Sequence, residues 1–191
     1  FYGFKDSVPV GDLTFEVEGV RIGMELCEDA WVARRPGRNL FNQAVDVIVN
    51  PSASHFALGK HEVRQQFAKE ASRTFGCAYV YANLLGCESG RAIFDGGNFI
   101  ASEGRIQSAT PPMDFRDWNI TLGEIDLQAN RISQQWSSQD AHIDQRGHIL
   151  VSKDSGIVRA RPRQQSPIAE EKPHDLVVRA ITLGLRDWMK K

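Results

Sequence analysis

Apolar residues along this chain gather in short runs that end in polar or glycine-containing loops. Three runs have the length of a strand: VRIGMEL (20–26), DVIV (46–49) and AYVYA (78–82). Cys27 follows the first run, NPSAS (50–54) the second and NLLGCESGR (83–91) the third. We therefore predict three buried strands, each of which leads into a polar loop.

Helical patterns separate these three runs. A short stretch, RNLFNQA (38–44), lies between the first and second run, and a longer one, KHEVRQQFAKEASRTF (60–75), lies between the second and third. Gly76 stands where the longer helix would end. Apolar residues of the longer stretch recur every four positions and form one stripe: Val63, Phe67, Ala71 and Phe75. Strands that alternate with helices predict an α/β fold.

The loops after the predicted strands carry the candidate chemistry. Ligands of α/β folds bind beyond the carboxyl ends of the strands, so the polar residues at these ends would share one rim. These residues are Cys27, Ser52, Ser54 and Asn83. Cys27 is placed like a nucleophile at a sheet edge. A small buried hydrophobe is the alternative reading of a cysteine at the end of an apolar run.

The second half of the chain changes character near residue 128. Before it, NFIAS (98–102) and RIQSA (105–109) predict a hairpin, and NITLGEIDL (119–127) predicts a strand. The segment 128–172 is rich in polar residues and reads as a linker or extended segment. A terminal helix over 173–191 carries one apolar face, and it either folds back onto the first domain or opens a domain that is absent. That face consists of Val177, Ile181, Leu185 and Trp188.

Composition and charge narrow the class of protein. The chain has 191 residues, 41% of them hydrophobic, which suffices for one substantial core. Its apolar runs are too short to cross a membrane, no signal peptide opens it, and we expect a cytoplasmic protein. The net charge is −1 and acidic and basic residues are interspersed, so the sequence gives no sign of a basic surface that would bind nucleic acid. The basic loop of Arg34, Arg35 and Arg38 reads as solvated surface.

The cysteines and histidines argue against disulfide and metal sites. Three cysteines, at positions 27, 77 and 87, are odd in number and lack Cys-x-x-Cys spacing, so we read them as free thiols. We interpret Cys77 as a core thiol and Cys87 as a loop thiol. His55 and His61 have no third ligand nearby in the sequence, so we predict no metal site.

Three ordered motifs resemble one family. GMELCEDAW (23–31), NPSASHFALGK (50–60) and YANLLGCESGRAIFDGGNFIAS (81–102) are similar to the nitrilase-like glutaminase domain of glutamine-dependent NAD+ synthetases. The terminal helix resembles the segment that leads into the synthetase domain. The resemblance implies a part of a four-layer αββα sandwich, with residues 1–127 as its carboxyl-terminal part. It also implies that Cys27 hydrolyses glutamine and that a second domain uses the ammonia to amidate adenylated deamido-NAD.

The resemblance also assigns a glutamine pocket. It implies that Glu28 meets the α-ammonium group of glutamine, that Ser54 lines the pocket, and that Lys60 stands where a basic residue could meet the α-carboxylate. Each residue has a structural alternative. Glu28 could solvate a strand end, Ser54 could serve as a turn or cap residue before the helix, and Lys60 could be a solvated surface residue.

Parts of the family pattern have no counterpart in the sequence. Nitrilase-like enzymes also use a Glu and a Lys that precede the cysteine, and only 26 residues precede Cys27. The Ser-Gly-Gly-x-Asp-Ser loop of the synthetase domain is missing as well. We therefore expect an internal piece of a longer, homo-oligomeric enzyme. It would hold no cofactor itself, and ATP and Mg²⁺ would bind the absent domain. The alternatives are a stand-alone nitrilase-like amidase and a non-catalytic structural remnant.

Overall fold

The protein is built around a mixed seven-stranded sheet. The computed structural model describes residues 11–88, 91–137, 148–150 and 172–190. The strand order is β8-β7-β4-β3-β2-β1-β9, and β2, β3 and β4 run parallel while β1, β7 and β8 pair antiparallel. The strands are β1 (Thr14–Val17), β2 (Val20–Met24), β3 (Val47–Ser52), β4 (Ala78–Asn83), β7 (Phe99–Ser102), β8 (Arg105–Ala109) and β9 (His148–Leu150). The three predicted strands, the predicted hairpin and the α/β class are confirmed.

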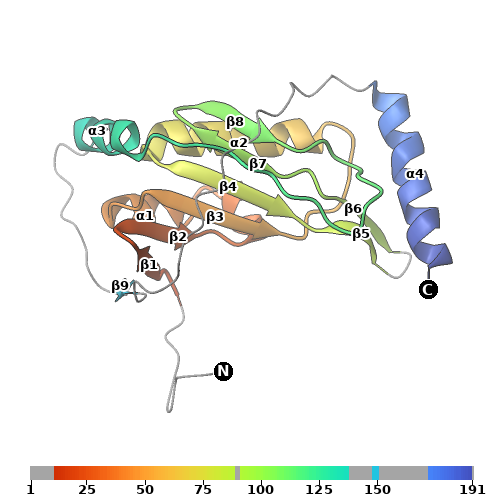
Figure 1. Cartoon of the computed structure of the whole chain (residues 1–191), viewed down its shortest axis with the longest axis horizontal. Helices are drawn as coiled ribbons and strands as arrows, with labels where there is room; N and C mark the ends of the chain where they lie inside the picture. The colour runs from red at the N-terminus through yellow and green to blue at the C-terminus, as the bar shows by residue number, and fades with distance from the viewer. Residues whose placement is uncertain (1–10, 89–90, 138–147, 151–171, 191) are drawn as a thin grey trace, which may run out of the picture.

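Helices cover one face of this sheet (Figure 1). The two predicted ones are α1 (Gly37–Asn42) and α2 (Lys60–Phe75), and α3 (Leu127–Ser137) packs beside α2. Helix α2 ends at Gly76, whose φ of 55° is a left-handed conformation that suits glycine. The buried face of α2 is turned from the predicted stripe, because it centres on Arg64, Ala68, Ala71 and Ser72.

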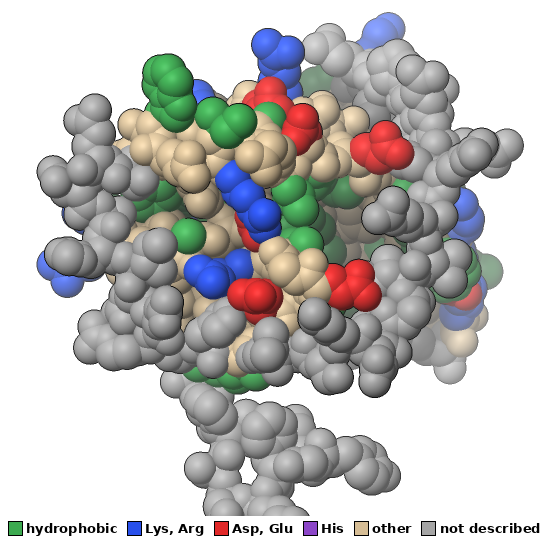
Figure 2. All heavy atoms as spheres, turned by 60° about the vertical axis from the view of Figure 1, so that its left-hand side comes forward, with side chains coloured by type: hydrophobic (Ala, Val, Ile, Leu, Met, Phe, Trp, Pro, Cys, Tyr) green, Lys and Arg blue, Asp and Glu red, His purple; other side chains and the backbone are tan. Residues whose placement is uncertain are grey.

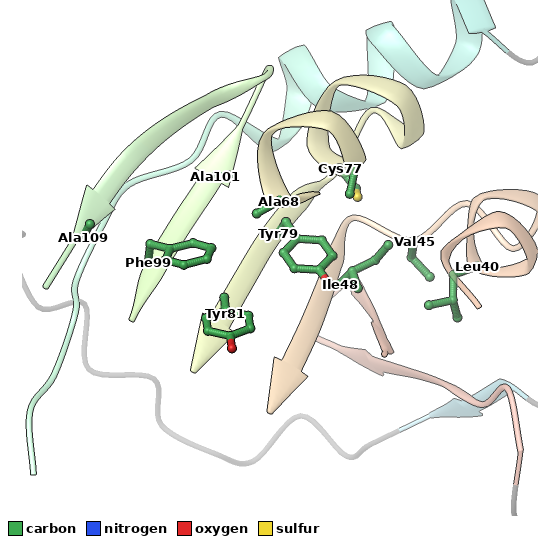
Figure 3. Packing of buried hydrophobic residues seen from close by; sticks show 11 residues of the cluster. Leu40, Val45, Ile48, Ala68, Cys77, Tyr79, Tyr81, Phe99, Ala101 and Ala109 are labelled. Atoms are coloured by element: carbon green, nitrogen blue, oxygen red, sulfur yellow. The ribbon is translucent and has the colours of Figure 1, made fainter. Parts of the chain in front are cut away.

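The core lies between the sheet and this helical layer (Figure 3). Large side chains from the strands fill it, and Tyr81 stacks on Phe99 with the ring centroids 4.7 Å apart. The fully or nearly buried members include Leu40, Val45, Ile48, Ala68, Cys77, Tyr79, Tyr81, Phe99 and Ala101. Their close packing makes β3 and β4 the rigid centre that carries the loops at the sheet edge.

The opposite face of the sheet is less completely covered. Ile48 of β3 is fully buried beneath the helices, whereas its neighbours Val47 and Val49, which point to the other face, are only partly buried. Met24 of β2 is 45% exposed on that face. A sandwich of two sheets would need a second layer at this position.

A small hairpin and the last helix form the other end of the molecule (Figure 1). Strands β5 (Leu85–Glu88) and β6 (Ala92–Asp95) pair antiparallel, and α4 (Pro173–Met189) packs on them through Ala180 and Leu183. The helix thus folds back onto the first domain, but with a face that the sequence pattern did not indicate. The predicted apolar residues lie at its more exposed side: Val177, Ile181, Leu185 and Trp188.

Two other expectations for the second half need correction. The predicted strand over 119–127 is wrong, because residues 119–126 have no regular structure and α3 begins at Leu127. Side-chain hydrogen bonds, and not the backbone hydrogen bonds of a strand pair, fix this segment. For example, Asn119 accepts a hydrogen bond from Asn98 at 2.5 Å. The expected linker or extended segment over 128–172 contains most of α3 and also β9, and residues 138–147 and 151–171 lie outside the described residues. Among the described residues, no helix is long and apolar enough to span a membrane.

Candidate functional site

Cys27 lies where β2 gives way to a short 3-10 helix, η1 (Cys27–Trp31). Its φ is 44°, a left-handed conformation that is costly for a residue with a side chain and that clusters at functional sites. A local turn holds it, because the Leu26 amide donates to Asp29 Oδ2 at 2.7 Å and the Asp29 amide donates to the Leu26 carbonyl at 2.9 Å. The thiol is partly exposed, so it is placed to meet a ligand at the sheet edge.

A buried carboxylate anchors this turn from below. Glu25, two residues before Cys27, is 0% exposed and accepts hydrogen bonds from Arg35 Nε at 2.9 Å, from the Gly37 amide at 2.7 Å and from the Tyr79 hydroxyl at 2.8 Å. Burial, reinforced by the charge of Glu25, raises the pKa of Tyr79, so its phenol stays protonated and donates. Asn50 donates to the Tyr79 hydroxyl at 2.9 Å and extends the network along β3.

Ser54 lies at the neighbouring strand end, in the loop after β3. Its amide donates to Asn83 Oδ1 at 2.8 Å and its carbonyl accepts from Asn83 Nδ2 at 3.0 Å, so one side chain at the end of β4 holds both peptide groups. Ser54 is buried, and within the described part of the chain its hydroxyl forms no hydrogen bond. The predicted rim therefore exists as far as Ser54 and Asn83 are concerned. Ser52 is engaged otherwise, because it donates to Asn50 at 2.6 Å.

Lys60 begins α2 and turns toward the η1 segment. Its Nζ lies 5.6 Å from the centre of the Trp31 ring and 3.4 Å from His55 Nε2. Trp31 also meets Phe67 of α2 edge to face at 4.6 Å. Burial lowers the pKa of Lys60, Arg64 acts in the same direction, and the charges of Asp95 and Cys27 oppose both. Lys60 is thus a partly buried cation within electrostatic reach of Cys27.

Glu28 is the predicted site residue that the fold constrains least. It is the second residue of η1, directly after Cys27, and its side chain is exposed. Cys27 and Lys60 thus lie within electrostatic reach of each other, Ser54 lies in the loop after β3 that leads to Lys60, and Glu28 is exposed beside Cys27.

Sequence reasoning missed two buried ion pairs beneath these residues. Arg35, interpreted as solvated surface, pairs with Glu25 at 2.5 Å, and Arg64 of α2 pairs with Asp95 at the end of β6. One signal could have found the first, because Glu25 interrupts an apolar run where a charge is costly unless it is paired. Nothing in the spacing links Arg64 to Asp95, which are 31 residues apart.

The other two cysteines lie away from the rim. Cys77 is fully buried, and burial raises the pKa of its thiol, which keeps it protonated and unreactive. Cys87 lies within β5 and not in a loop. Its backbone amide donates a hydrogen bond to Asp187 of α4 at 2.9 Å.

A pocket of about 340 Å³ lies at the opposite edge of the sheet, beside α3. Figure 2 shows basic and acidic side chains gathered on this face. The charges offset one another, since Arg131 pairs with Asp46 and Arg21 pairs with Glu16. The pocket lies at the amino ends of β2 and β3, which places it away from Cys27.

Comparisons with known proteins agree with this geometry. No protein-family profile matches the chain. The chain is 32% identical over 127 residues to the glutamine-dependent NAD(+) synthetase of Drosophila melanogaster, covering 66% of this chain and 16% of that protein. It is 31% identical over 144 residues to the enzyme of that name from Oryza sativa subsp. indica, covering 75% of this chain and 19% of that protein.

Solved structures extend the likeness. The glutamine-dependent NAD(+) synthetase of Cytophaga hutchinsonii is 39% identical and covers 59% of this chain and 18% of that chain, with a TM-score of 0.52. The glutamine-dependent NAD+ synthetase of Acinetobacter baumannii in complex with ADP is 20% identical, with a TM-score of 0.66. The match covers 99% of this chain and 30% of that chain. A carbon-nitrogen hydrolase from Helicobacter pylori is 18% identical, with a TM-score of 0.54, and the match covers 66% of this chain and 47% of that chain. The last two show the fold alone.

The resemblance drawn from the three motifs is therefore confirmed, and the nitrilase-like α/β fold with it. The similarity has a defined extent. The chain spans only 16% to 19% of the length of these two curated relatives, so it corresponds to a small part of proteins of that kind.

Proposed function

We propose that this chain, similar to glutamine-dependent NAD+ synthetases over about two thirds of its length, is part of the ammonia-supplying glutaminase domain of such an enzyme. The remainder would lie in a longer polypeptide, which we call the full-length protein. The observation that carries the proposal is Cys27, held in a left-handed conformation at the carboxyl end of a parallel strand and within electrostatic reach of Lys60.

In this reaction the Cys27 thiolate attacks the carboxamide carbon of glutamine. The carbon becomes tetrahedral and its oxygen takes the negative charge. The proton taken from the thiol then passes to the nitrogen, and collapse of the intermediate expels ammonia and leaves a γ-glutamyl thioester. Water then attacks the thioester, which releases glutamate and restores the thiol. The ammonia would pass to the synthetase domain, where ATP and deamido-NAD react.

The thiolate and not the thiol is the nucleophile, so the attack needs a base that takes the Cys27 proton. The Glu and Lys of the nitrilase pattern would supply this function from the part of the full-length protein before Cys27. They would also stabilise the oxyanion and activate water. The incompletely covered sheet face around Met24 supports this, because the absent layer would pack there and bring these groups to the thiol.

The amino-acid end of glutamine is the proposed partner of three residues. Glu28 would pair with the α-ammonium group, Ser54 would donate its free hydroxyl, and Lys60 would pair with the α-carboxylate. The partial burial of Lys60 supports this role over that of a solvated surface residue, since a desolvated cation gains more from a carboxylate.

ATP and Mg²⁺ would belong to the synthetase domain. Among the described residues, no cluster of three His, Cys, Asp or Glu side chains could hold a metal ion. A homo-oligomer and a cytoplasmic location remain part of the proposal.

The upstream and downstream coding sequence tests this proposal against its alternatives. An in-frame segment with the missing Glu and Lys before Cys27, and an ATP-pyrophosphate loop after Lys191, would support the synthetase. A catalytic Glu and Lys without that loop would favour a stand-alone amidase. The absence of both the catalytic Glu and Lys and the ATP-pyrophosphate loop would favour a non-catalytic remnant.

A further inference from the structure

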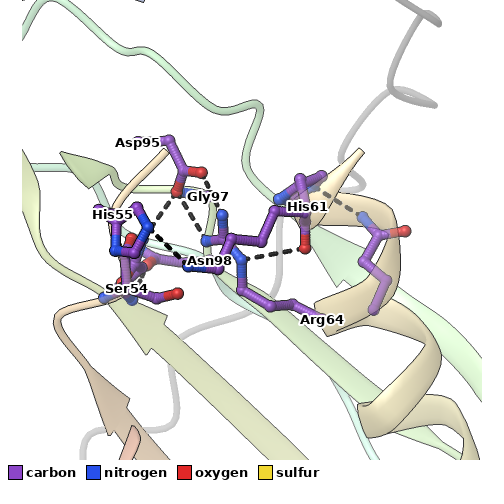
Figure 4. Close-up of polar contacts among 10 residues, drawn as sticks. Ser54, His55, His61, Arg64, Asp95, Gly97 and Asn98 are labelled. Carbon is purple, nitrogen blue, oxygen red and sulfur yellow. Dashed lines mark hydrogen bonds and ion pairs between the residues drawn. The ribbon is translucent and has the colours of Figure 1, made fainter. Parts of the chain in front are cut away.

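Arg64 and Asp95 form an ion pair that is closed to water (Figure 4). Each side chain is 1% exposed, and Arg64 Nη1 donates to Asp95 Oδ1 at 2.8 Å while Nη2 donates to Oδ2. Burial alone would raise the pKa of Asp95, but its hydrogen bonds and the charge of Arg64 hold that pKa below its usual range. The carboxylate is therefore a fixed, charged acceptor at neutral pH.

Asn83 connects this carboxylate to Ser54. Its Nδ2 donates to Asp95 Oδ1 at 2.7 Å and to the Ser54 carbonyl at 3.0 Å, and its Oδ1 accepts from the Ser54 amide at 2.8 Å. A charged carboxylate can only accept, so Asp95 fixes the Asn83 Nδ2 group toward itself and the Ser54 carbonyl, which leaves Oδ1 for the Ser54 amide. The orientation of Asn83, and with it the backbone of Ser54, follows from the charge of Asp95.

Arg64 connects the same ion pair to Lys60. Its Nε donates to the Lys60 carbonyl at 3.2 Å, four residues earlier in the first turn of α2. Arg64 also lies over the Tyr81 ring, with its guanidinium carbon 5.9 Å from the ring centre. Because the guanidinium is planar and bidentate on Asp95, its Nε points in one direction only. The start of α2, and the base of the Lys60 side chain, are fixed by the same pair.

We propose that Asp95, Arg64 and Asn83 are positioning residues that set Ser54 and Lys60 for the amino-acid end of glutamine. This inference rests on the proposed function. A buried ion pair is weak evidence for stability, because apolar side chains of the same volume often stabilise as well. Here the pair does what apolar side chains could not do. It directs hydrogen bonds to the backbone of the two residues that would bind the amino-acid end of one ligand.

The test is steady-state glutaminase kinetics of the full-length protein. Asn83→Ala keeps both partners of the ion pair and removes the side chain that links Asp95 to Ser54. We expect its KM for glutamine to rise about 10- to 100-fold, kcat to change by less than about threefold, and ammonia-dependent synthesis to be unchanged. Arg64→Lys keeps the charge beside Asp95 but loses the hydrogen bond to the Lys60 carbonyl, and we expect a KM change in the same direction.

Asn130→Ala is the matched control. Asn130 is also a buried asparagine, but it lies on α3 and accepts from Ser102, away from the rim. A loss of thermal stability without a change in KM is expected for this variant. An unchanged KM in both Asn83→Ala and Arg64→Lys, or an equal KM change in Asn130→Ala, would overturn the inference while leaving the proposed function intact. A full-length protein without glutaminase activity before any substitution would overturn both.

Discussion

Two buried ion pairs lie beneath the same edge of the sheet, and they support different parts of the candidate site. Glu25 and Arg35 lie under Cys27, while Asp95 and Arg64 lie under Ser54 and Lys60. The first pair joins residues ten apart, and its arginine side chain remains 15% exposed. The second pair ties α2 to β6 and both partners are closed to water. The residue that would react and the residues that would bind are thus held by separate supports.

The largest expected effect is on the reacting side. In the full-length protein, Cys27→Ala should abolish glutamine-dependent synthesis, a loss of several orders of magnitude, because no thioester can form. Synthesis from added ammonia should persist, since the second domain can take free ammonia. Cys87→Ser is the control and should retain both activities. Residual glutamine-dependent synthesis in Cys27→Ala would contradict the assignment of the nucleophile.

The two ion pairs should differ in their contribution to stability. Asp95→Asn leaves Arg64 charged and sealed from water, which should cost about 3 to 5 kcal/mol of local unfolding free energy. Glu25→Gln should cost less, because Arg35 can reach solvent. Amide hydrogen exchange of α2 and β6 in the first variant, and of β2 and α1 in the second, measures both. Equal losses would mean that the difference in burial has no energetic consequence.

Binding residues should affect KM and spare the ammonia reaction. Loss of one charge-assisted hydrogen bond, worth about 1.5 to 3 kcal/mol, corresponds to a rise of roughly 10- to 150-fold in KM for glutamine. We expect this for Glu28→Ala and for Ser54→Ala. Initial rates with glutamine and with ammonia, measured side by side, separate the two effects. Unchanged KM values in both variants would return these residues to a purely structural role.

The smallest effect should appear in the pH dependence of binding. Because the pKa of Lys60 is lowered, its charge is present below that pKa and is lost as the pH rises through it. KM for glutamine should therefore rise at a lower pH than for an ordinary lysine, and Lys60→Arg should shift this rise to higher pH. Lys69→Arg, at an exposed position of α2, is the control and should leave the profile unchanged. Identical profiles for all three proteins would exclude Lys60 from the binding step.

Local signals predicted the elements that carry the site. Apolar runs before Cys27 and Asn83 predicted two strands, and an amphipathic stretch before Gly76 predicted a helix. The structure has β2, β4 and α2 at these places. The strand over 119–127 was mispredicted because its alternating residues suit a strand, yet side-chain bonds such as the one between Asn98 and Asn119 hold it instead.

Contacts between distant residues could not be predicted in this way. Arg64 lies within the helical stretch as one more polar residue, and its burial follows from Asp95, which a separate hairpin brings to α2. Helix α4 illustrates the same limit. Its amphipathic pattern was recognised, but the helix packs on the hairpin through Ala180 and Leu183, and a Cβ at Gly184 would come within 3.2 Å of Ile93.

Covalent labelling of Cys27 tests the central claim most directly. A diazo ketone analogue of glutamine carries the amino-acid end of the substrate and an electrophile at the position of the carboxamide. Incubated with the full-length protein and analysed by peptide mass spectrometry, it should add to Cys27, and excess glutamine should protect against the addition. An adduct on Cys77 or Cys87 in place of Cys27 would contradict the account.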